Sequence, residues 1–95
     1  MPTFELTRSC SVDWEKLTPE QQARFKVVLQ RFIQDAAGGH FRPGLRVKGV
    51  RSAPGVFEMT WASDERATFE ISAVQGSGLH VVWRRIGGHD ILDRP

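Results

Sequence analysis

The sequence predicts an α+β fold: an N-terminal strand, one or two helices, and then a four-stranded, mostly antiparallel, curved sheet with the helices packed on one face. Two observations lead to it. Apolar residues recur every three to four positions in the first part of the chain, and they alternate with polar residues after Pro43-Gly44. Because the 95 residues contain no internal linker or repeat, we expect a single domain spanning residues 1–95.

The N-terminal elements are short. Residues 3–7 alternate apolar and polar side chains, which predicts a first strand. In the segment that follows, Trp14 and Leu17 lie three positions apart and therefore share one face of a helix. We expect one or two helical turns over residues 11–17.

A longer helix follows, and its start and end are both marked in the sequence. Thr18-Pro19-Glu20-Gln21 combines an N-cap residue, a proline at the first helical position and a capping-box partner. Gly38-Gly39 ends the pattern. Between these signals the apolar residues form one helical stripe, made of Phe25, Val28, Leu29, Phe32, Ile33 and Ala36.

Four strands are expected at residues 45–48, 56–61, 67–72 and 79–83, where apolar and polar side chains alternate or apolar ones dominate. Ala53-Pro54-Gly55 predicts a type II turn, and tight connections are expected at residues 63–65 and 75–78. The most apolar strand, 79–83, is expected inside the sheet. The remaining tail, residues 86–92, is interpreted as irregular.

Alternation assigns each strand residue to one of two faces. The face against the helix should carry Phe57, Met59, Trp61, Phe69, Ile71, Val81 and Trp83. The opposite, polar face should carry Arg46, Lys48, Glu58, Thr60, Thr68, Glu70, His80 and Arg84.

Positive charge is concentrated in part of the chain. The 13 Lys and Arg exceed the 11 Asp and Glu by only two, but residues 39–57 hold four cations and no acid. Ten of the 13 cations are arginines, which suit bidentate contacts to phosphate or carboxylate. This distribution indicates a polyanion or an acidic protein as partner, or else a basic face that serves only solubility.

Composition also excludes several classes of protein. Cys10 is the only cysteine, so no intrachain disulfide can form and the thiol is best explained as buried and inert. No apolar run reaches the ~20 residues of a membrane helix, and no secretory signal opens the chain. We therefore expect a cytoplasmic protein without a membrane partner. His40, His80 and His89 lack zinc-site spacing, so no metal or cofactor is expected.

One group of residues could nevertheless perform chemistry. Cleavage of RNA needs no metal: the 2′-hydroxyl attacks its own phosphodiester while a base removes its proton, cations hold the phosphorane charge and an acid protonates the leaving 5′-oxygen. Residues of the required types lie on the predicted sheet and its tail, namely His89, Asp64, Lys48, Arg66, Arg84 and Arg85. The alternative is that His89 is only a turn residue in a Gly-Gly-His-Asp loop.

The order of these motifs resembles the RelE/ParE superfamily of bacterial toxins from type II toxin–antitoxin pairs. The resemblance rests on residues 4–7, 17–21, 45–49, 55–61, 66–69 and 83–90, which together run through nearly the whole chain. The closing Arg85-x-Gly87-x-His89 is similar to the ending of the YafQ-type branch.

The resemblance implies a ribosome-dependent endoribonuclease that cuts mRNA and inhibits translation. By analogy His89 would transfer protons, Arg85 would clamp the phosphate and Asp64 would be an acidic site residue. The RNA-binding cations would be Arg46, Lys48, Arg66 and Arg84. The implied partners are a cognate antitoxin, the ribosome and mRNA; without antitoxin the chain would be a monomer or a homodimer.

Two alternatives stay open at this point. One is a ParE-like protein that inhibits DNA gyrase by contact and cleaves nothing. The other is a catalytically degenerate relative that only binds RNA or protein. Glu58 and Thr60 favour the latter, because they stand on a strand where related toxins often carry Arg or His.

Overall fold

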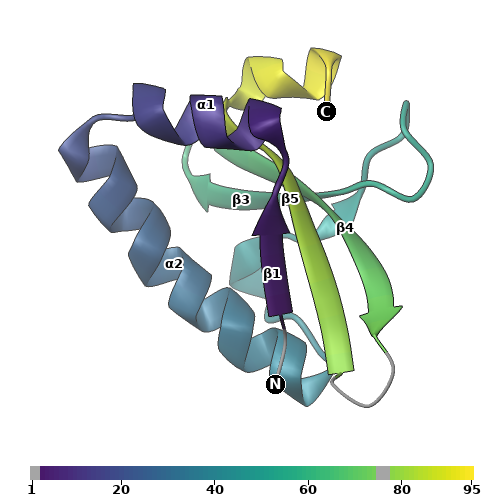
Figure 1. Cartoon of the computed structure of the whole chain (residues 1–95). Coiled ribbons are helices and arrows are strands. Elements are labelled where there is room, and N and C mark those ends of the chain that lie inside the picture. Colours follow the sequence, from purple (N-terminus) through teal and green to yellow (C-terminus); the bar gives the residue numbers. More distant parts are fainter. Residues whose placement is uncertain (1–2, 75–77) are drawn as a thin grey trace.

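The computed structural model describes residues 3–74 and 78–95, so that residues 75–77 of the connection expected at 75–78 lie outside the described residues. Figure 1 shows the α+β architecture that the sequence predicts, with both main helices on one face of a five-stranded sheet. In chain order the elements are β1 (Thr3–Leu6), α1 (Arg8–Lys16), α2 (Pro19–Gly38), the 3-10 turn η1 (Pro43–Leu45), β2 (Lys48–Gly49), β3 (Phe57–Ala62), β4 (Glu65–Val74), β5 (Gly78–Gly88) and the 3-10 turn η2 (His89–Asp93). No helix in the described ranges is long and apolar enough to cross a membrane.

The two helices begin where their capping residues lie. The hydroxyl of Thr7 accepts a hydrogen bond from the amide of Cys10 and caps α1. Thr18 and Gln21 form the expected capping box at the start of α2, with bonds of 3.2 and 2.8 Å. Gly39 ends α2 in the left-handed conformation, with φ of 77°, which glycine adopts without a Cβ clash.

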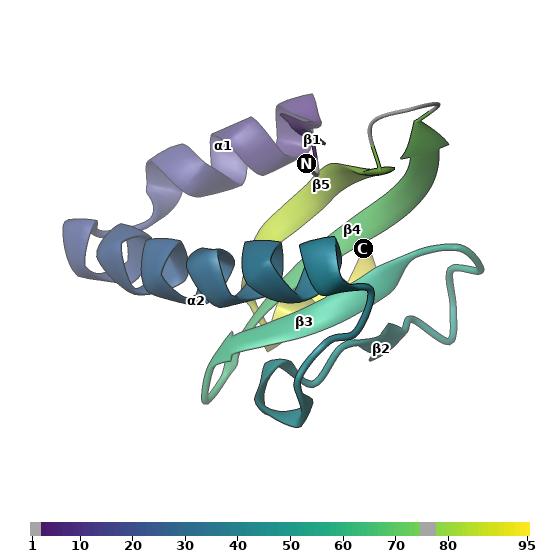
Figure 2. The same ribbon diagram turned by 90° about the horizontal axis from the view of Figure 1, so that it is seen from below.

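The strands lie in the order β1-β5-β4-β3-β2. β1 runs parallel to β5, and the other neighbours are antiparallel. The expectation that residues 79–83 lie inside the sheet is confirmed, because β5 has neighbours on both sides. Seen from below, α1 and α2 lie together on one side of the twisted strands (Figure 2).

Two local expectations were wrong. The strand expected at 45–48 shrinks to Lys48–Gly49, because Pro43 opens a 3-10 turn that carries Leu45 into the core. The tail at 86–92 is not irregular. β5 continues to Gly88 because β4 pairs with it there, with Arg66 opposite Gly87, and residues 89–93 then form η2.

Aromatic side chains fill the space between α2 and the sheet. The Phe32 ring centroid lies 5.1 Å from that of Phe69 and 4.9 Å from that of Trp83, and Phe25 meets Trp61 at 5.5 Å. Such edge and tilted contacts are favourable beyond the area they bury. The stripe predicted on α2 is thus the face that builds the core.

The polar face is less open than the sequence predicts. We call the side of the sheet opposite α1 and α2 the outer face. On it Glu58 and Thr68 face each other across β3 and β4, and both are buried. Val50, Val56 and Ile91 are buried as well, yet they lie outside the core cluster between helices and sheet. These three side chains are therefore buried by contacts outside that cluster.

Candidate functional site

A bulge in β5 places two neighbouring arginines at one end of the sheet. Phe69 pairs with Trp83 while Thr68 pairs with Arg85, so Arg84 is an extra residue in β5. Bulges re-aim side chains relative to a regular strand. In this structure the two arginine side chains bind different carboxylates: Arg84 pairs with Glu70 and Arg85 with Asp13.

Arg85 is held by α1. Its Nε donates to Asp13 Oδ2 at 2.7 Å and its Nη2 to Oδ1 at 3.3 Å, while Nη1 donates to the Arg94 carbonyl at 3.0 Å. Asp13 Oδ2 also accepts the amide of Ile86 at 3.1 Å. Because β1 stops opposite Trp83, this amide has no partner strand, and the Asp13 carboxylate takes that role.

This arrangement sets the ionisation of two groups. Hydrogen bonding to Asp13 raises the pKa of Arg85, so its guanidinium stays charged. Burial, together with the nearby Asp13 charge, raises the pKa of the Cys10 thiol to about 12. A thiol that is neutral at physiological pH and fully buried is a poor nucleophile, as the sequence indicated for Cys10.

Three more basic side chains of the outer face are paired with acids across strands. Arg84 Nη1 lies 3.0 Å from Glu70 Oε2, Lys48 Nζ lies 3.7 Å from Glu58 Oε1, and His80 Nε2 lies 2.8 Å from Glu5 Oε1. Each pair joins neighbouring strands. The face that the sequence predicts to be basic is therefore largely neutralised by its own acids.

A second group lies at the corner where the β3–β4 turn meets the end of β5. The amide of His89 donates to the Asp64 carbonyl at 3.0 Å, and Arg66 pairs with Gly87 in the register of β4 and β5. His89 and Asp64 are exposed, and Arg66 is half-buried. We call Asp64, Arg66 and His89 the corner cluster.

Two glycines make the corner possible. A Cβ on Gly87 would lie 3.0 Å from Ile91 Cγ2, so a larger residue there would require the Ile91 side chain to shift. At Gly88 a Cβ would lie 3.1 Å from Asp90 Oδ1 and 3.9 Å from the Asp64 carbonyl oxygen. The Gly-Gly pair thus brings His89 against the β3–β4 turn.

The corner cluster has the side chains that acid–base chemistry on an anion requires. Imidazole titrates near neutral pH and can give or take a proton. Among the described residues, no carboxylate lies within 4.0 Å of the Arg66 guanidinium, so its charge is available to an anionic ligand. The Arg66 Nη1 donates only to the neighbouring Glu65 carbonyl, at 3.0 Å.

The predicted site residues therefore separate into three places. Asp64, Arg66 and His89 meet at the corner, and Arg84 and Arg85 lie a few residues away along β5 in ion pairs. Lys48 and Arg46 lie toward the opposite edge, at β2 and just after η1. No group of three or more His, Cys, Asp or Glu side chains within residues 3–74 and 78–95 could hold a metal ion.

Sequence reasoning missed Asp13, which positions Arg85. A signal was available, because Asp13 lies three residues after Cys10 and four before Leu17, both on the apolar side of α1. A carboxylate on the buried side of a helix needs a hydrogen-bonded partner, and an arginine is the usual one.

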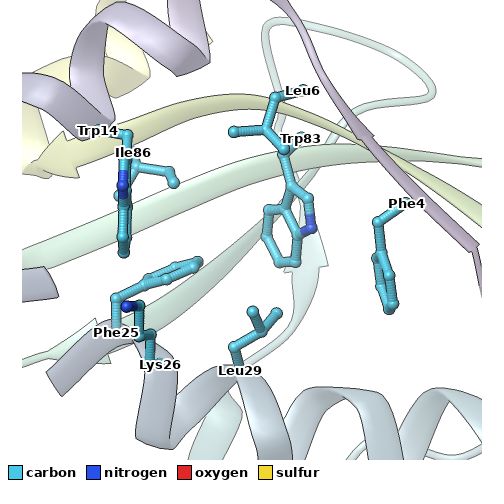
Figure 3. Close-up of a pocket in the computed structure, with 8 residues that line it drawn as sticks. All are labelled: Phe4, Leu6, Trp14, Phe25, Lys26, Leu29, Trp83 and Ile86. Carbon is cyan, nitrogen blue, oxygen red and sulfur yellow. The ribbon is translucent and has the colours of Figure 1, made fainter. Parts of the chain in front are cut away.

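An apolar pocket of about 260 Å³ opens between β1, α1 and α2 (Figure 3). Trp14 and Phe25 meet in it edge to face, and the Lys26 ammonium at its rim lies 5.9 Å from the Trp14 ring centroid. Apart from Lys26, the residues that line it are apolar: Phe4, Leu6, Trp14, Phe25, Leu29, Trp83 and Ile86. The pocket could hold an apolar side chain.

In sequence, the chain matches no family model and no curated protein. In structure it is similar to a YoeB/ParE toxin from Agrobacterium tumefaciens, with a TM-score of 0.67 and 18% identity over 92% of this chain and 98% of that chain. It is also similar to the YafQ toxin in the E. coli DinJ-YafQ toxin–antitoxin complex, with a TM-score of 0.68 and 14% identity over 96% of both chains. A second structure of that complex gives a TM-score of 0.64 and 13% identity, over 97% of this chain and 98% of that chain.

At these identities the likeness concerns the fold. The chain has the fold of the RelE/ParE toxins, as the resemblance in its sequence implied.

Proposed function

We propose that the chain is the toxin of a type II toxin–antitoxin pair, and that it is an endoribonuclease that cuts mRNA on the ribosome. Three structural neighbours support the toxin role, since each is a toxin or belongs to a toxin–antitoxin complex, and each covers 92–97% of this chain. The corner cluster is the observation that carries the nuclease activity. It combines a histidine, a carboxylate and a guanidinium that forms no ion pair with any carboxylate among the described residues.

In the proposed reaction the RNA 2′-hydroxyl attacks the adjacent phosphorus and the 5′-oxygen leaves, so that the phosphodiester becomes a 2′,3′-cyclic phosphate. His89 and Asp64 carry the two proton transfers: a base takes the proton of the 2′-hydroxyl, and an acid protonates the leaving 5′-oxygen. Arg66 stabilises the charge that develops on the phosphorane. Arg85 joins it as a phosphate clamp when its Asp13 contact is exchanged for substrate, and Arg84, Lys48 and Arg46 bind the flanking backbone.

The proposed partners are a cognate antitoxin and the ribosome with its mRNA, which places the protein in the cytoplasm. The YafQ neighbour is bound to the DinJ antitoxin in its own structures. For this chain we propose that an apolar antitoxin segment enters the pocket of Figure 3 while another part covers Arg46, Lys48 and Arg84.

A second candidate is a protein that binds its target without cleaving RNA. The ion pairs favour it, because Arg85, Arg84 and Lys48 are each bound to a carboxylate of the chain itself. The target would then be DNA gyrase, as for a ParE-like inhibitor, or an RNA or protein bound by a relative that has lost catalysis.

Expression in bacteria separates these possibilities. Wild type, His89→Ala and the control His40→Ala, which changes an exposed histidine outside the cluster, are induced while growth and new mRNA ends are followed by primer extension. The proposal expects growth arrest with cleavage from wild type and control, and loss of both in His89→Ala. Arrest by all proteins without cleavage would favour gyrase inhibition. No arrest from folded, soluble protein would favour the degenerate relative.

A further inference from the structure

A groove between α2 and β3 is rimmed by three arginines. It has a volume of about 280 Å³, and its rim includes Arg24, Arg31 and Arg42. Its floor includes Val28, Leu45 and Trp61, all of them buried core residues. No acidic residue of the described part of the chain lines it.

Two of these arginines have free donors. Among the residues that the structure describes, Arg24 donates one side-chain hydrogen bond, from its Nε to the Trp61 carbonyl at 3.4 Å. Within the described ranges neither Arg24 nor Arg31 has a carboxylate within 4.0 Å. Glu20 lies one helical turn before Arg24 but does not form an ion pair with it. Arg42 differs, because its guanidinium already forms an ion pair with Asp35.

An exposed apolar side chain lies between the two free arginines. Val27 is 56% exposed and lines a second depression, of about 340 Å³, which shares Arg24, Val28 and Arg31 with the groove. Arg24 and Arg31 are seven residues apart, or about 10 Å along the helix axis. The surface is thus a short apolar strip with one cation at each end.

We propose that this surface binds an acidic amphipathic helix of a partner protein. Two carboxylates seven residues apart on such a helix match Arg24 and Arg31, and an apolar side chain between them covers Val27 and the groove floor. The proposal concerns a different surface from the corner cluster and does not depend on RNA cleavage.

A protein fits this surface better than RNA does. The cations are all arginines, which are enriched in protein interfaces, while lysines are depleted there. Single-stranded RNA needs accessible aromatic rings for base stacking, and the aromatic ring in the groove, that of Trp61, is buried.

The test is a titration of ¹⁵N-labelled protein with two synthetic helical peptides of 16 residues. Both contain two leucines in an alanine-rich host; one has glutamates seven residues apart around them and its twin has glutamines. We expect saturable chemical-shift changes at Arg24, Val27 and Arg31 with the acidic peptide, and about tenfold weaker binding of the twin.

Two variants give the matched comparison. Arg24→Glu combined with Arg31→Glu should abolish binding of the acidic peptide. Arg8→Glu combined with Arg51→Glu makes the same change of charge at two exposed arginines that do not line the groove, so binding should stay within about twofold of wild type. Should the double variant unfold, the glutamine twin still tests the charge requirement on the wild-type protein.

Three outcomes would overturn the proposal: no saturable shifts with the acidic peptide, equal affinity for the two peptides, or tighter binding of a single-stranded oligoribonucleotide at these same residues. Loss of nuclease activity in His89→Ala has no bearing on the peptide titration, so failure of the two proposals can be told apart.

Discussion

Two aspartates in this molecule each bind an arginine through both carboxylate oxygens, an arrangement that we call a fork. The two forks differ in how far apart their aspartate and arginine lie in the sequence. Asp35 Oδ2 accepts both the Nε and the backbone amide of Arg42 at 2.8 Å, and Oδ1 accepts Nη2 at 2.9 Å. Asp13 makes the same fork to Arg85 and takes its additional amide from Ile86. The first pair is seven residues apart in sequence and the second is 72.

The difference lies in what each fork holds. The Asp35 fork closes a short loop after α2, and its arginine side chain is 42% exposed. The Asp13 fork joins α1 to the unpaired edge of β5, with 12% of the Asp13 and 27% of the Arg85 side chain exposed. Because the Asp13–Arg85 pair is more buried and joins distant parts of the chain, breaking it should lower the free energy of unfolding more than breaking the Asp35–Arg42 pair.

The largest effect is expected from Asp13→Ala. Removing the carboxylate leaves the Arg85 guanidinium and the Ile86 amide without their partner, and hydrogen bonds to charged groups are worth the most. We predict a loss of about 2 kcal/mol in the free energy of unfolding, measured by urea denaturation. Glu15→Ala, at an exposed position of α1, is the control and should change it by less than about 0.5 kcal/mol. Equal effects of the two changes would contradict the special role of Asp13.

Replacing the arginines by lysine tests the geometry without changing the charge. Lysine cannot form a fork, so Arg85→Lys should cost about 1 kcal/mol of unfolding free energy. Arg42→Lys should cost less, because its side chain is more exposed. Both are measured by the same urea denaturation. A larger loss for Arg42→Lys would reverse the ranking of the two forks.

The pH dependence of the free energy of unfolding measures how much the Asp35–Arg42 pair contributes to stability. Hydrogen bonds from Arg42 lower the pKa of Asp35 from 3.8 to about 2. A carboxylate whose pKa is lower in the folded state stabilises the fold above its unfolded pKa, and this contribution is lost as the pH falls from about 4 toward 2. Asp35→Asn should therefore be less stable than wild type at pH 6, and the difference should shrink below pH 4. A difference that is constant with pH would rule out this linkage.

The smallest effect is expected on the rate at which iodoacetamide modifies the Cys10 thiol in the folded protein. Cys10 is fully buried and the pKa of its thiol is raised to about 12, so iodoacetamide should not modify it in the folded wild type at pH 7.5. Modification should follow unfolding, and Asp13→Ala should speed it more than Asp35→Asn does. Mass spectrometry measures the rate. Rapid labelling of wild type in the absence of unfolding would show that α1 opens locally.

Much of the fold could be predicted because its signals are local. Thr18 and Gln21 are neighbours in the capping box, and Pro54 and Gly55 form the expected type II turn, with Gly55 at φ of 85° and a 3.0 Å bond from the Val56 amide to the Ala53 carbonyl. The strand expected at residues 45–48 fails because alternation of apolar residues does not distinguish a strand from a turn that buries Leu45.

The candidate site was predictable as a set of residue types and less so as an arrangement. His89, Asp64 and Arg66 come together because β4 and β5 pair up to Gly88, which alternation in the tail did not indicate. Glu58 was expected on the polar face, yet it is buried, opposite Thr68 and beside Lys48.

The amino-acid sequence by itself determined most of the strands, the start and end of α2 and the apolar face of α2, because caps, turns and periodicity act over a few residues. Tertiary structure decided which charges remain available. Arg85 and Lys48 find acids on other elements, while Arg24 and Arg31 find none in the described residues. Coulomb interactions depend on distance in space, and chain position does not give that distance until the strands have paired.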